Sequence, residues 1–492
     1  MISPSLRFRA SLVAGCVLLC LSGCASDSDG PSPPARPNVV FVVVDTLRAD
    51  HMSLYGYERS TTPKIDELSK RGTVFEQALA GSSWTLPSMA MLFTGTYLPP
   101  SVKQLGSGEY PLTESFFNAG YRTGAVISNP LLGKVRNLLA RDEQPKSFAS
   151  GFERGFDSFD VFELSPTDST PEFGQTNGWY GGEVVQRGTD WVESTDARQD
   201  GESSPYFLYL HLFDPHFPRT PKDRTRVLAE PSEERFADLL SRSPSVKASA
   251  QSRKLYAWVE DEIALYDSEI AHVDDALGAL FAWLESRGEL ESTVVVLTSD
   301  HGEGLWEREL PEGEKPKLYN QLPALYSDHG IQLYSEQTRV PLVIWGPGIT
   351  PGERVTEAVS LLDVSPTLHV LADIAPPVQA PAFSGGDLFG ERELHQDVFS
   401  FCTRSASLTE GGRWRLHLPA SYRSEGFGAL PELYDLEADP QERNPVADSG
   451  RIEAMSMRIR EHQERAAKRE ELAAEEVLAR RKLLDGLGYT DQ

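Results

Sequence analysis

Three apolar runs constrain the fold of this chain more than any other feature. They are "NVVFVVVD" from Asn38, "FLYLHLFDPH" from Phe207 and "TVVVLTSDHG" from Thr293. A strand that is apolar on both faces needs helices on both sides of its sheet. Segments with helical spacing separate the runs, the longest from Arg253 to Arg287. We therefore expect an α/β fold with a doubly wound, mostly parallel central sheet.

Further strands are expected at "GTVFEQALA", "GYRTGAVISN" and "RVPLVIWGPG", and a short helix at "TTPKIDELSKRG". The polar stretches 141–201 and 305–327 are expected to be surface loops. From about Pro376 the pattern changes to short strands at "DVFSFCTR" and "RWRLHLP". A charged helix then follows from about Arg451 to Leu484. We expect a main domain at 37–375 and a smaller C-terminal α+β subdomain at 376–492.

The N-terminus has the pattern of an export signal. Arg7 and Arg9 precede "SLVAGCVLLCLSGC", an apolar run shorter than the roughly 20 residues that span a bilayer. "LSGC" resembles a bacterial lipobox, so we expect a lipoprotein signal peptide at 1–23 and a lipid on Cys24. A polar tether at 24–36 would then hold an exported lipoprotein in the cell envelope, in the periplasm or at the cell surface. An ordinary secretory signal and an uncleaved anchor are the alternatives.

The cysteine content argues against an internal disulfide, and the charge argues against a nucleic-acid-binding protein. Cys16 and Cys20 lie in the predicted signal, so a lipidated Cys24 leaves Cys402 without a disulfide partner. The chain carries 73 acidic and 47 basic residues, a formal net charge of −26. This balance argues against nucleic acid as a partner. An anionic ester is still a suitable substrate if a metal ion and local cations set the field at the site.

Polar side chains follow the three apolar runs at the point where each ends. Asp45 follows the first, Asp214 and His216 the second, and Asp300 and His301 the third. Ligands of open α/β sheets collect at the carboxyl ends of parallel strands. Two carboxylates and an imidazole suit a divalent cation, although each residue alone also fits a helix cap or turn.

The stretch "SSWTLPSMAMLFTG", from Ser82 to Gly95, predicts a helix that begins near Pro87. Thr85 stands at its start and fits two roles. It can be an N-cap, or it can be a nucleophile at a helix N-terminus, where the macrodipole favours an anion. A nearby cation would lower the pKa of its hydroxyl.

A series of ordered motifs resembles the sulfatase family of the alkaline phosphatase superfamily, over about Pro37 to Tyr489. They are "PNVVFVVVDTLRADHMSLYGY", "SSWTLPSMAMLFTG", "FLYLHLFDPHFP", "VVVLTSDHGEGL", "DHGIQLYSEQTRVPLVIWGPG" and "ELYDLEADPQERN". The resemblance implies an ester hydrolase whose metal ligands are Asp45, Thr85, Asp300 and His301. It also implies that Thr85 is the nucleophile and that His216 and His329 contact the substrate anion or leaving group.

The chain departs from the family pattern at four positions. The family converts a Cys or Ser to formylglycine, whereas "TLPSM" has Thr85, so formylglycine is not expected. Met89 replaces an arginine that helps to hold the sulfate, and Thr46 replaces a second acidic ligand. His301 stands where many sulfatases have Asn, which favours one zinc or manganese ion, with calcium and magnesium as alternatives.

These departures leave three functions open. The first is hydrolysis of phosphoric monoesters or diesters through a covalent Thr85 ester. The second is hydrolysis of a sulfuric ester, on a sulfated glycan or an aryl sulfate. The third is a non-catalytic surface lipoprotein that binds an anion. His216 can instead be a structural histidine and His329 a loop residue, and His211 is expected to be a hydrogen-bonded core histidine. The substrate is a small-molecule, glycan or lipid ester, and the sequence does not indicate an oligomeric state.

Overall fold

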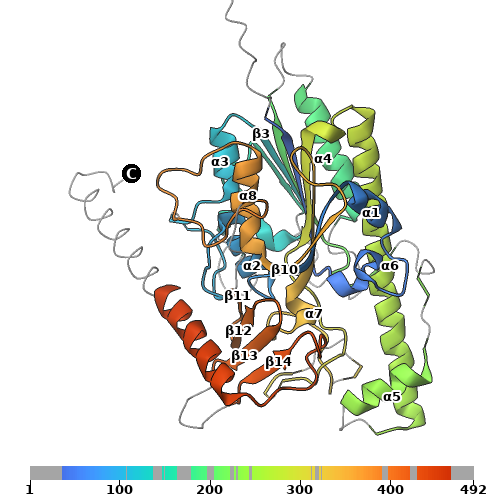
Figure 1. The fold of residues 1–492 in the computed structure, drawn as a ribbon. Coiled ribbons are helices and arrows are strands. Elements are labelled where there is room, and N and C mark those ends of the chain that lie inside the picture. Colours follow the sequence, from blue (N-terminus) through green and yellow to red (C-terminus); the bar gives the residue numbers. More distant parts are fainter. Residues whose placement is uncertain are drawn as a thin grey trace, which may run out of the picture. The chain divides into compact units, whose positions relative to one another are not determined.

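The computed structural model describes residues 36–466 except 107, 134, 137–146, 149, 163–178, 197–203, 222–226, 229–230, 243–246, 312, 316–320, 323, 391–396 and 422–428. The described residues belong to one compact unit (Figure 1). The predicted signal peptide, Cys24 and nearly all of the tether lie outside the described residues, as does the end of the C-terminal helix. Within the described ranges, no helix combines the length and the hydropathy needed to cross a bilayer.

An eight-stranded sheet forms the centre, in the order β10–β2–β9–β8–β1–β7–β3–β6. Its strands are β1 (Asn38–Val44), β2 (Gly72–Leu79), β3 (Arg122–Ile127), β6 (Ser158–Val161), β7 (Tyr206–Leu212), β8 (Thr293–Ser299), β9 (Arg339–Trp345) and β10 (Glu353–Ser360). Of these eight, β9 alone pairs antiparallel with its neighbours, and the other pairings are parallel. The expected doubly wound, mostly parallel fold is confirmed.

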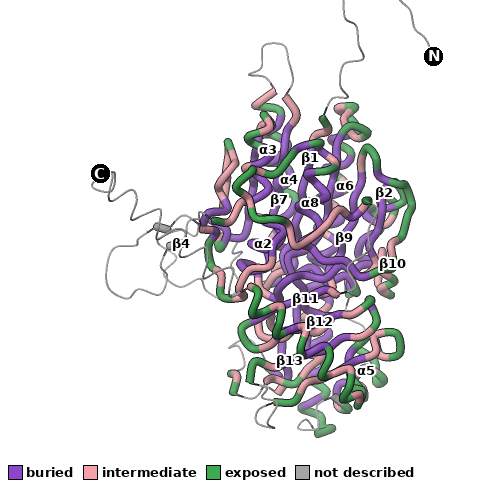
Figure 2. Tube along the Cα trace, turned by 60° about the vertical axis from the view of Figure 1, so that its left-hand side comes forward, coloured by how far each residue is buried: buried purple, intermediate pink, exposed green. Residues whose placement is uncertain are grey.

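Helices cover both faces of the sheet, and the side chains of β1 alternate between the two layers. Val40, Val42 and Val44 pack in one apolar cluster with α1 (Pro63–Leu68), α4 (Gly181–Asp196) and α6 (Ala250–Ser286). Val39, Phe41 and Val43 pack in another with α2 (Thr85–Thr94), α3 (Leu112–Asn118) and α8 (Val364–Leu371). Figure 1 shows the sheet between these two sets of helices, and Figure 2 shows that its strands are buried. Burial on both faces explains why these strands read as continuous apolar runs.

One stretch expected to be surface loop contains a packed helix. Within 141–201, α4 lies against β7 and β3 and buries Val184, Val185 and Val192. The expectation is therefore wrong for residues 181–196. The described part of 305–327 has no helix or strand, apart from an isolated bridge between Glu309 and Leu325. It is not a surface loop throughout, because Leu305, Trp306 and Leu325 are buried in the core.

A second, antiparallel sheet lies C-terminal to α8 in the order β11–β12–β13–β14. Its strands are β11 (Asp397–Phe401), β12 (Ser405–Glu410), β13 (Trp414–Pro419) and β14 (Glu432–Asp435). The helix at 449–466 packs on it through Met455 and Ile459. This sheet agrees with the expected α+β arrangement, while the boundary at 375/376 stays a prediction. The sequence predicted neither β12 nor β14.

The remaining elements are short. They are α5 (Glu233–Arg242), α7 (Ser335–Thr338), the two-stranded sheet of β4 (Val135–Arg136) and β5 (Ser147–Phe148), and the 3₁₀ turns η1 (Ala49–His51), η2 (Ser53–Tyr55), η3 (Ser69–Arg71), η4 (Pro130–Leu132), η5 (Leu290–Ser292) and η6 (Leu361–Asp363).

Candidate active site

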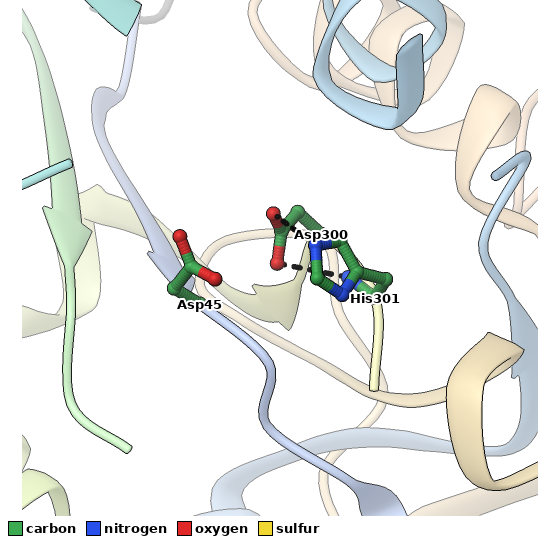
Figure 3. A group of neighbouring side chains, drawn as sticks. All are labelled: Asp45, Asp300 and His301. Carbon is green, nitrogen blue, oxygen red and sulfur yellow. Dashed lines mark hydrogen bonds and ion pairs between the residues drawn. The ribbon is translucent and has the colours of Figure 1, made fainter. Parts of the chain in front are cut away.

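The ends of two neighbouring strands bring Asp45, Asp300 and His301 together. β1 and β8 pair in parallel with Val44 level with Ser299, so the next residues, Asp45 and Asp300, emerge side by side. Each of the three residues offers a donor atom within 4.8 Å of the others, and all three are buried (Figure 3). The parallel register of the sheet therefore builds this cluster.

The donor atoms of the cluster fit a divalent cation. Oδ1 of Asp45 and Oδ2 of Asp300 are buried without a hydrogen-bond partner, and the latter lies 3.2 Å from His301 Nε2. Such bare carboxylate oxygens are costly in a protein interior unless a cation faces them. Nδ1 of His301 lies 2.8 Å from the Gly302 carbonyl and donates to it, so Nε2 keeps its lone pair. Metal-binding histidines are commonly held in this way.

Burial and mutual repulsion act differently on the two carboxyl groups. Burial and the nearby Asp45 carboxylate raise the pKa of Asp300 above its ordinary value. Burial also opposes the charge of Asp45, but the hydrogen bond from His211 and the nearby imidazoles outweigh it and lower the pKa of Asp45. A bound cation would favour the ionised form of both groups.

Side chains behind Asp45 fix its orientation. The amide Nδ2 of Asn129 donates to Asp45 Oδ2 at 2.6 Å, and His211 Nε2 lies 3.2 Å from the same oxygen. The Tyr209 hydroxyl contacts the other His211 nitrogen at 2.7 Å. His211 is thus the hydrogen-bonded core histidine that was expected, although it supports a candidate ligand. Sequence reasoning missed Asn129, even though it follows β3 at the same edge of the sheet.

Thr85 is the first residue of α2 and lies against the cluster. Its Oγ1 is 3.2 Å from His301 Nε2, and its side chain is buried. The N-cap of α2 is Trp84, so the alternative role of Thr85 as the cap is wrong. Ser88 ties the helix to the strand end, because its Oγ donates to the Asp300 carbonyl at 2.5 Å. The helix N-terminus thus places a hydroxyl beside the candidate cation site.

His216 and His329 continue the same group of side chains. The His329 ring centroid lies 4.5 Å from that of His301 and 5.2 Å from that of His216. Burial lowers the pKa of His216. Burial also works against a charged His329, but the Glu303 carboxylate outweighs it and raises the pKa of His329 to about 9. All predicted site residues except Cys24 therefore meet at one place in the fold.

A second group of possible donors, Glu303, Asp328 and His329, adjoins the first. Sequence reasoning did not single out Glu303, which stands two residues after His301. Gly302 separates them at a tight approach, since a Cβ there would lie 2.1 Å from the Glu336 carbonyl oxygen. The loop after β8 therefore presents the side chains of His301 and Glu303 on either side of a position that has room only for glycine.

The remaining singled-out residues have structural partners. Arg48 pairs with Asp50 at 2.7 Å, and His51 contacts Asp267 at 2.7 Å. Met89 is buried in the apolar cluster on the α2 face of the sheet, so it offers no charge to an anion. Thr46 has a positive φ of 56° and donates its N–H to Asp300 Oδ1 at 3.2 Å.

Comparisons with known proteins agree with this geometry. The sulfatase family model matches residues 37–374. The chain is 25% identical to arylsulfatase of Clostridium perfringens, covering 84% of this chain and 91% of that protein. It is 24% identical to the ulvan-active sulfatase of Formosa agariphila, over 70% of this chain and 63% of that protein. The chain thus spans less than two thirds of the latter.

Two solved structures illustrate the shared fold. A phosphonate monoester hydrolase of Agrobacterium radiobacter superposes with a TM-score of 0.62 at 20% identity, over 88% of this chain and 96% of that one. A protein solved with its substrate D-glucosamine-2-N,6-O-disulfate gives a TM-score of 0.63 at 17% identity, over 88% and 98%. The same fold therefore occurs in proteins named for phosphonate esters and for sulfate esters.

Proposed function

Since the chain belongs to the sulfatase family, whose members are metal-dependent ester hydrolases, we propose that it hydrolyses phosphoric monoesters or diesters with Thr85 as the nucleophile. One observation carries the proposal: the Thr85 hydroxyl lies 3.2 Å from His301 Nε2, beside two buried carboxylate oxygens that have no hydrogen-bond partner. A hydroxyl in this place is suited to attack an ester whose anionic oxygens face a cation.

Asp45, Asp300, His301 and Thr85 would hold one divalent cation, and zinc or manganese suits an imidazole-containing set best. When bound, the cation lowers the pKa of a neighbouring hydroxyl and offsets the charge of the ester oxygens. Asn129 and His211 keep Asp45 oriented for this purpose. The Gly302 carbonyl keeps the His301 proton on Nδ1.

The reaction would proceed in two displacements. The Thr85 hydroxyl gives up its proton to solvent, its Oγ1 attacks phosphorus, and the bond from phosphorus to the leaving oxygen breaks. His216 or His329 gives a proton to that oxygen. Water then attacks the phosphothreonine, which releases phosphate or a phosphate monoester and restores the Thr85 hydroxyl.

The side chain at 85 favours phosphate over sulfate. The resemblance implies that sulfatases use formylglycine, whose aldehyde hydrate expels sulfate after the first displacement, and threonine offers no such route. Direct attack of water on a covalent ester suits phosphorus. Met89 is buried, and the resemblance implies that the family has an arginine at this position that helps to hold the sulfate. This chain therefore lacks that cation.

The test compares four aryl esters: sulfate, phosphate monoester, phosphate diester and phosphonate. We expect kcat/KM for one of the phosphorus esters to exceed that for the sulfate at least ~10-fold. Thr85→Ala should lower kcat by about 10⁴-fold or more, whereas the matched variant Thr85→Ser keeps a hydroxyl and measurable activity. Full activity of Thr85→Ala on all four esters would contradict the proposal.

A sulfuric ester hydrolase is the second candidate, because curated relatives of this chain include an arylsulfatase and an ulvan-active sulfatase. A highest kcat/KM on the aryl sulfate in the same panel would select it. Sulfated glycans would then be the first natural substrates to try.

We also propose that the enzyme is held in the cell envelope by a lipid on Cys24, on the basis of the lipobox-like "LSGC". Mass spectrometry of the mature N-terminus should find a diacylglyceryl-modified Cys24. Cys24→Ser should move the protein from the membrane to the soluble fraction. An unmodified N-terminus at another residue would contradict the anchor.

A further inference from the structure

Glu303 occupies a fixed position on the turn that follows β8. Its side chain is 3% exposed. Its backbone N–H donates to the Glu336 carbonyl at 3.0 Å, and its own carbonyl accepts from Arg48 Nη1 at 3.0 Å. Because both backbone groups of Glu303 are hydrogen-bonded, the position of its carboxylate is restricted.

The Glu303 carboxylate connects the loops that carry the three histidines of the site. Its Oε1 lies 3.2 Å from Nδ1 of His329, and its Oε2 lies 3.3 Å from Nη2 of Arg219. Arg219 is buried in the loop that also carries His216, and its guanidinium lies over the Tyr266 ring at 5.2 Å. Glu303 itself belongs to the loop of His301. One carboxylate therefore fixes three loops relative to one another.

A second cation is a weaker explanation for this cluster. Glu303, Asp328 and His329 stand close enough together to hold one. However, both Glu303 oxygens already face donors, and one of these is the permanent charge of Arg219. A divalent cation next to a buried guanidinium would meet strong repulsion. The arrangement is that of an ion pair which orients an imidazole.

We propose that Glu303 is a positioning residue that acts through His329 by holding its Nδ1–H and leaving Nε2 to face the leaving oxygen of the ester. The proposal rests on the function given above. In the first displacement, the proton on His329 Nε2 passes to the departing oxygen, while the Glu303 carboxylate continues to accept the Nδ1 proton. Arg219 orients Glu303 and takes no part in the proton transfer.

A double-mutant cycle on the purified full chain tests this coupling. The variants are Glu303→Gln, His329→Ala and the two combined, with Glu309→Gln as a control that removes an exposed charge from the same loop. Each is measured on two phosphate esters that differ only in the leaving group, 4-nitrophenyl or ethyl. Circular dichroism and metal content are recorded for every variant.

We expect Glu303→Gln to lower kcat/KM for the ethyl ester by about 10²-fold, and for the 4-nitrophenyl ester by less than about 10-fold, because a good leaving group needs little protonation. In the His329→Ala background, Glu303→Gln should cost less than about 2-fold more. Equal losses in both backgrounds would overturn the proposal. So would a loss of bound metal in Glu303→Gln at unchanged circular dichroism.

Binding of orthovanadate, measured by calorimetry through the same cycle, separates this inference from the proposed function. If the protein is inactive on every ester, the proposed function is wrong. The inference then stands if Glu303→Gln weakens vanadate binding in the presence of His329 and leaves it unchanged without it. It falls if the two effects are independent or if vanadate does not bind.

Discussion

Two groups of acidic and imidazole side chains adjoin each other at the carboxyl edge of the sheet, and their acidic oxygens differ in what they touch. In the first group, Asp45 and Asp300 each keep one buried oxygen without a hydrogen-bond partner, and that of Asp300 lies 3.2 Å from His301 Nε2. In the second, Arg219 and His329 engage both oxygens of Glu303. The chain thus neutralises the second group by itself and leaves the first to a cation from solution. Similar residue types therefore serve different purposes, depending on their neighbours.

The strongest test of this difference removes one carboxylate from each group. Asp300→Asn should lose the bound metal and lower kcat/KM by about 10³-fold or more, the scale of losing a group that stabilises transition-state charge. Asp328→Asn should keep the metal. Elemental analysis of dialysed protein and ester kinetics measure both effects. Equal metal loss in the two variants would mean that the groups share one cation.

Glu442, a buried carboxylate remote from the cation cluster, shows how much an internal ion pair contributes to stability. Glu442 is buried, contacts His417 Nε2 at 2.7 Å and lies 3.6 Å from Arg415 Nε. Glu442→Gln leaves Arg415 without its counter-charge and should lower the free energy of unfolding by about 3 kcal/mol. Urea denaturation measures it. The exposed Glu437→Gln is the control and should change stability by less than about 0.5 kcal/mol.

Glu442 also makes the free energy of unfolding depend on pH. Burial opposes the charge of Glu442, but Arg415 and His417 outweigh it and lower its pKa below the ordinary 4.5. The native chain then binds fewer protons than the unfolded chain below that pH, so this contribution is present above pH 4.5 and is lost on acidification. Glu442→Gln should therefore unfold with a shallower acid dependence than the wild type. An unchanged acid profile would contradict the pairing.

Removal of the cation should have a smaller effect on stability. A chelator should lower the free energy of unfolding of the wild type by about 2.7 kcal/mol, relative to protein in a free cation concentration of 100 times Kd. Asp300→Asn should not respond to the chelator. Differential scanning calorimetry with and without chelator reports both. A response of Asp300→Asn equal to that of the wild type would place the cation elsewhere.

The smallest effect is expected at Met89. Its side chain packs in the apolar cluster on the α2 face. Met89→Leu keeps the volume and should change the free energy of unfolding by less than about 1.5 kcal/mol, with ester activity within about 2-fold of the wild type. Thermal denaturation and the ester panel measure these. An activity loss above about 10-fold would assign Met89 to the anion site after all.

The sequence predicted the buried strands and the residues at their ends because both signals are local. The reverse direction of β9 was not predictable from its composition. In the structure, β9 begins at the edge of the sheet where β8 ends, and the two strands therefore run antiparallel. α4 was missed because its glycines resemble a loop. Gly188 instead allows the helix to approach β7, where a Cβ would lie 2.6 Å from Leu210.

The supporting residues of the site were missed for a different reason. Asn129 and Glu303 gain their importance from contacts with Asp45 and His329, which lie on other elements. A single strand end cannot reveal such partners. Sequence patterns therefore point to the groups that face the reaction, and only the folded chain points to those that hold them in place.

The glycine between His301 and Glu303 has a consequence for mutational scanning. Because even a methyl group at 302 would collide with the backbone of α7, alanine there should damage the enzyme as severely as a change at a neighbouring ligand. A tolerance map would mark this position as essential although it contributes no reactive atom. Loss of activity on substitution at 302 would reflect how closely the backbone of Gly302 approaches that of α7.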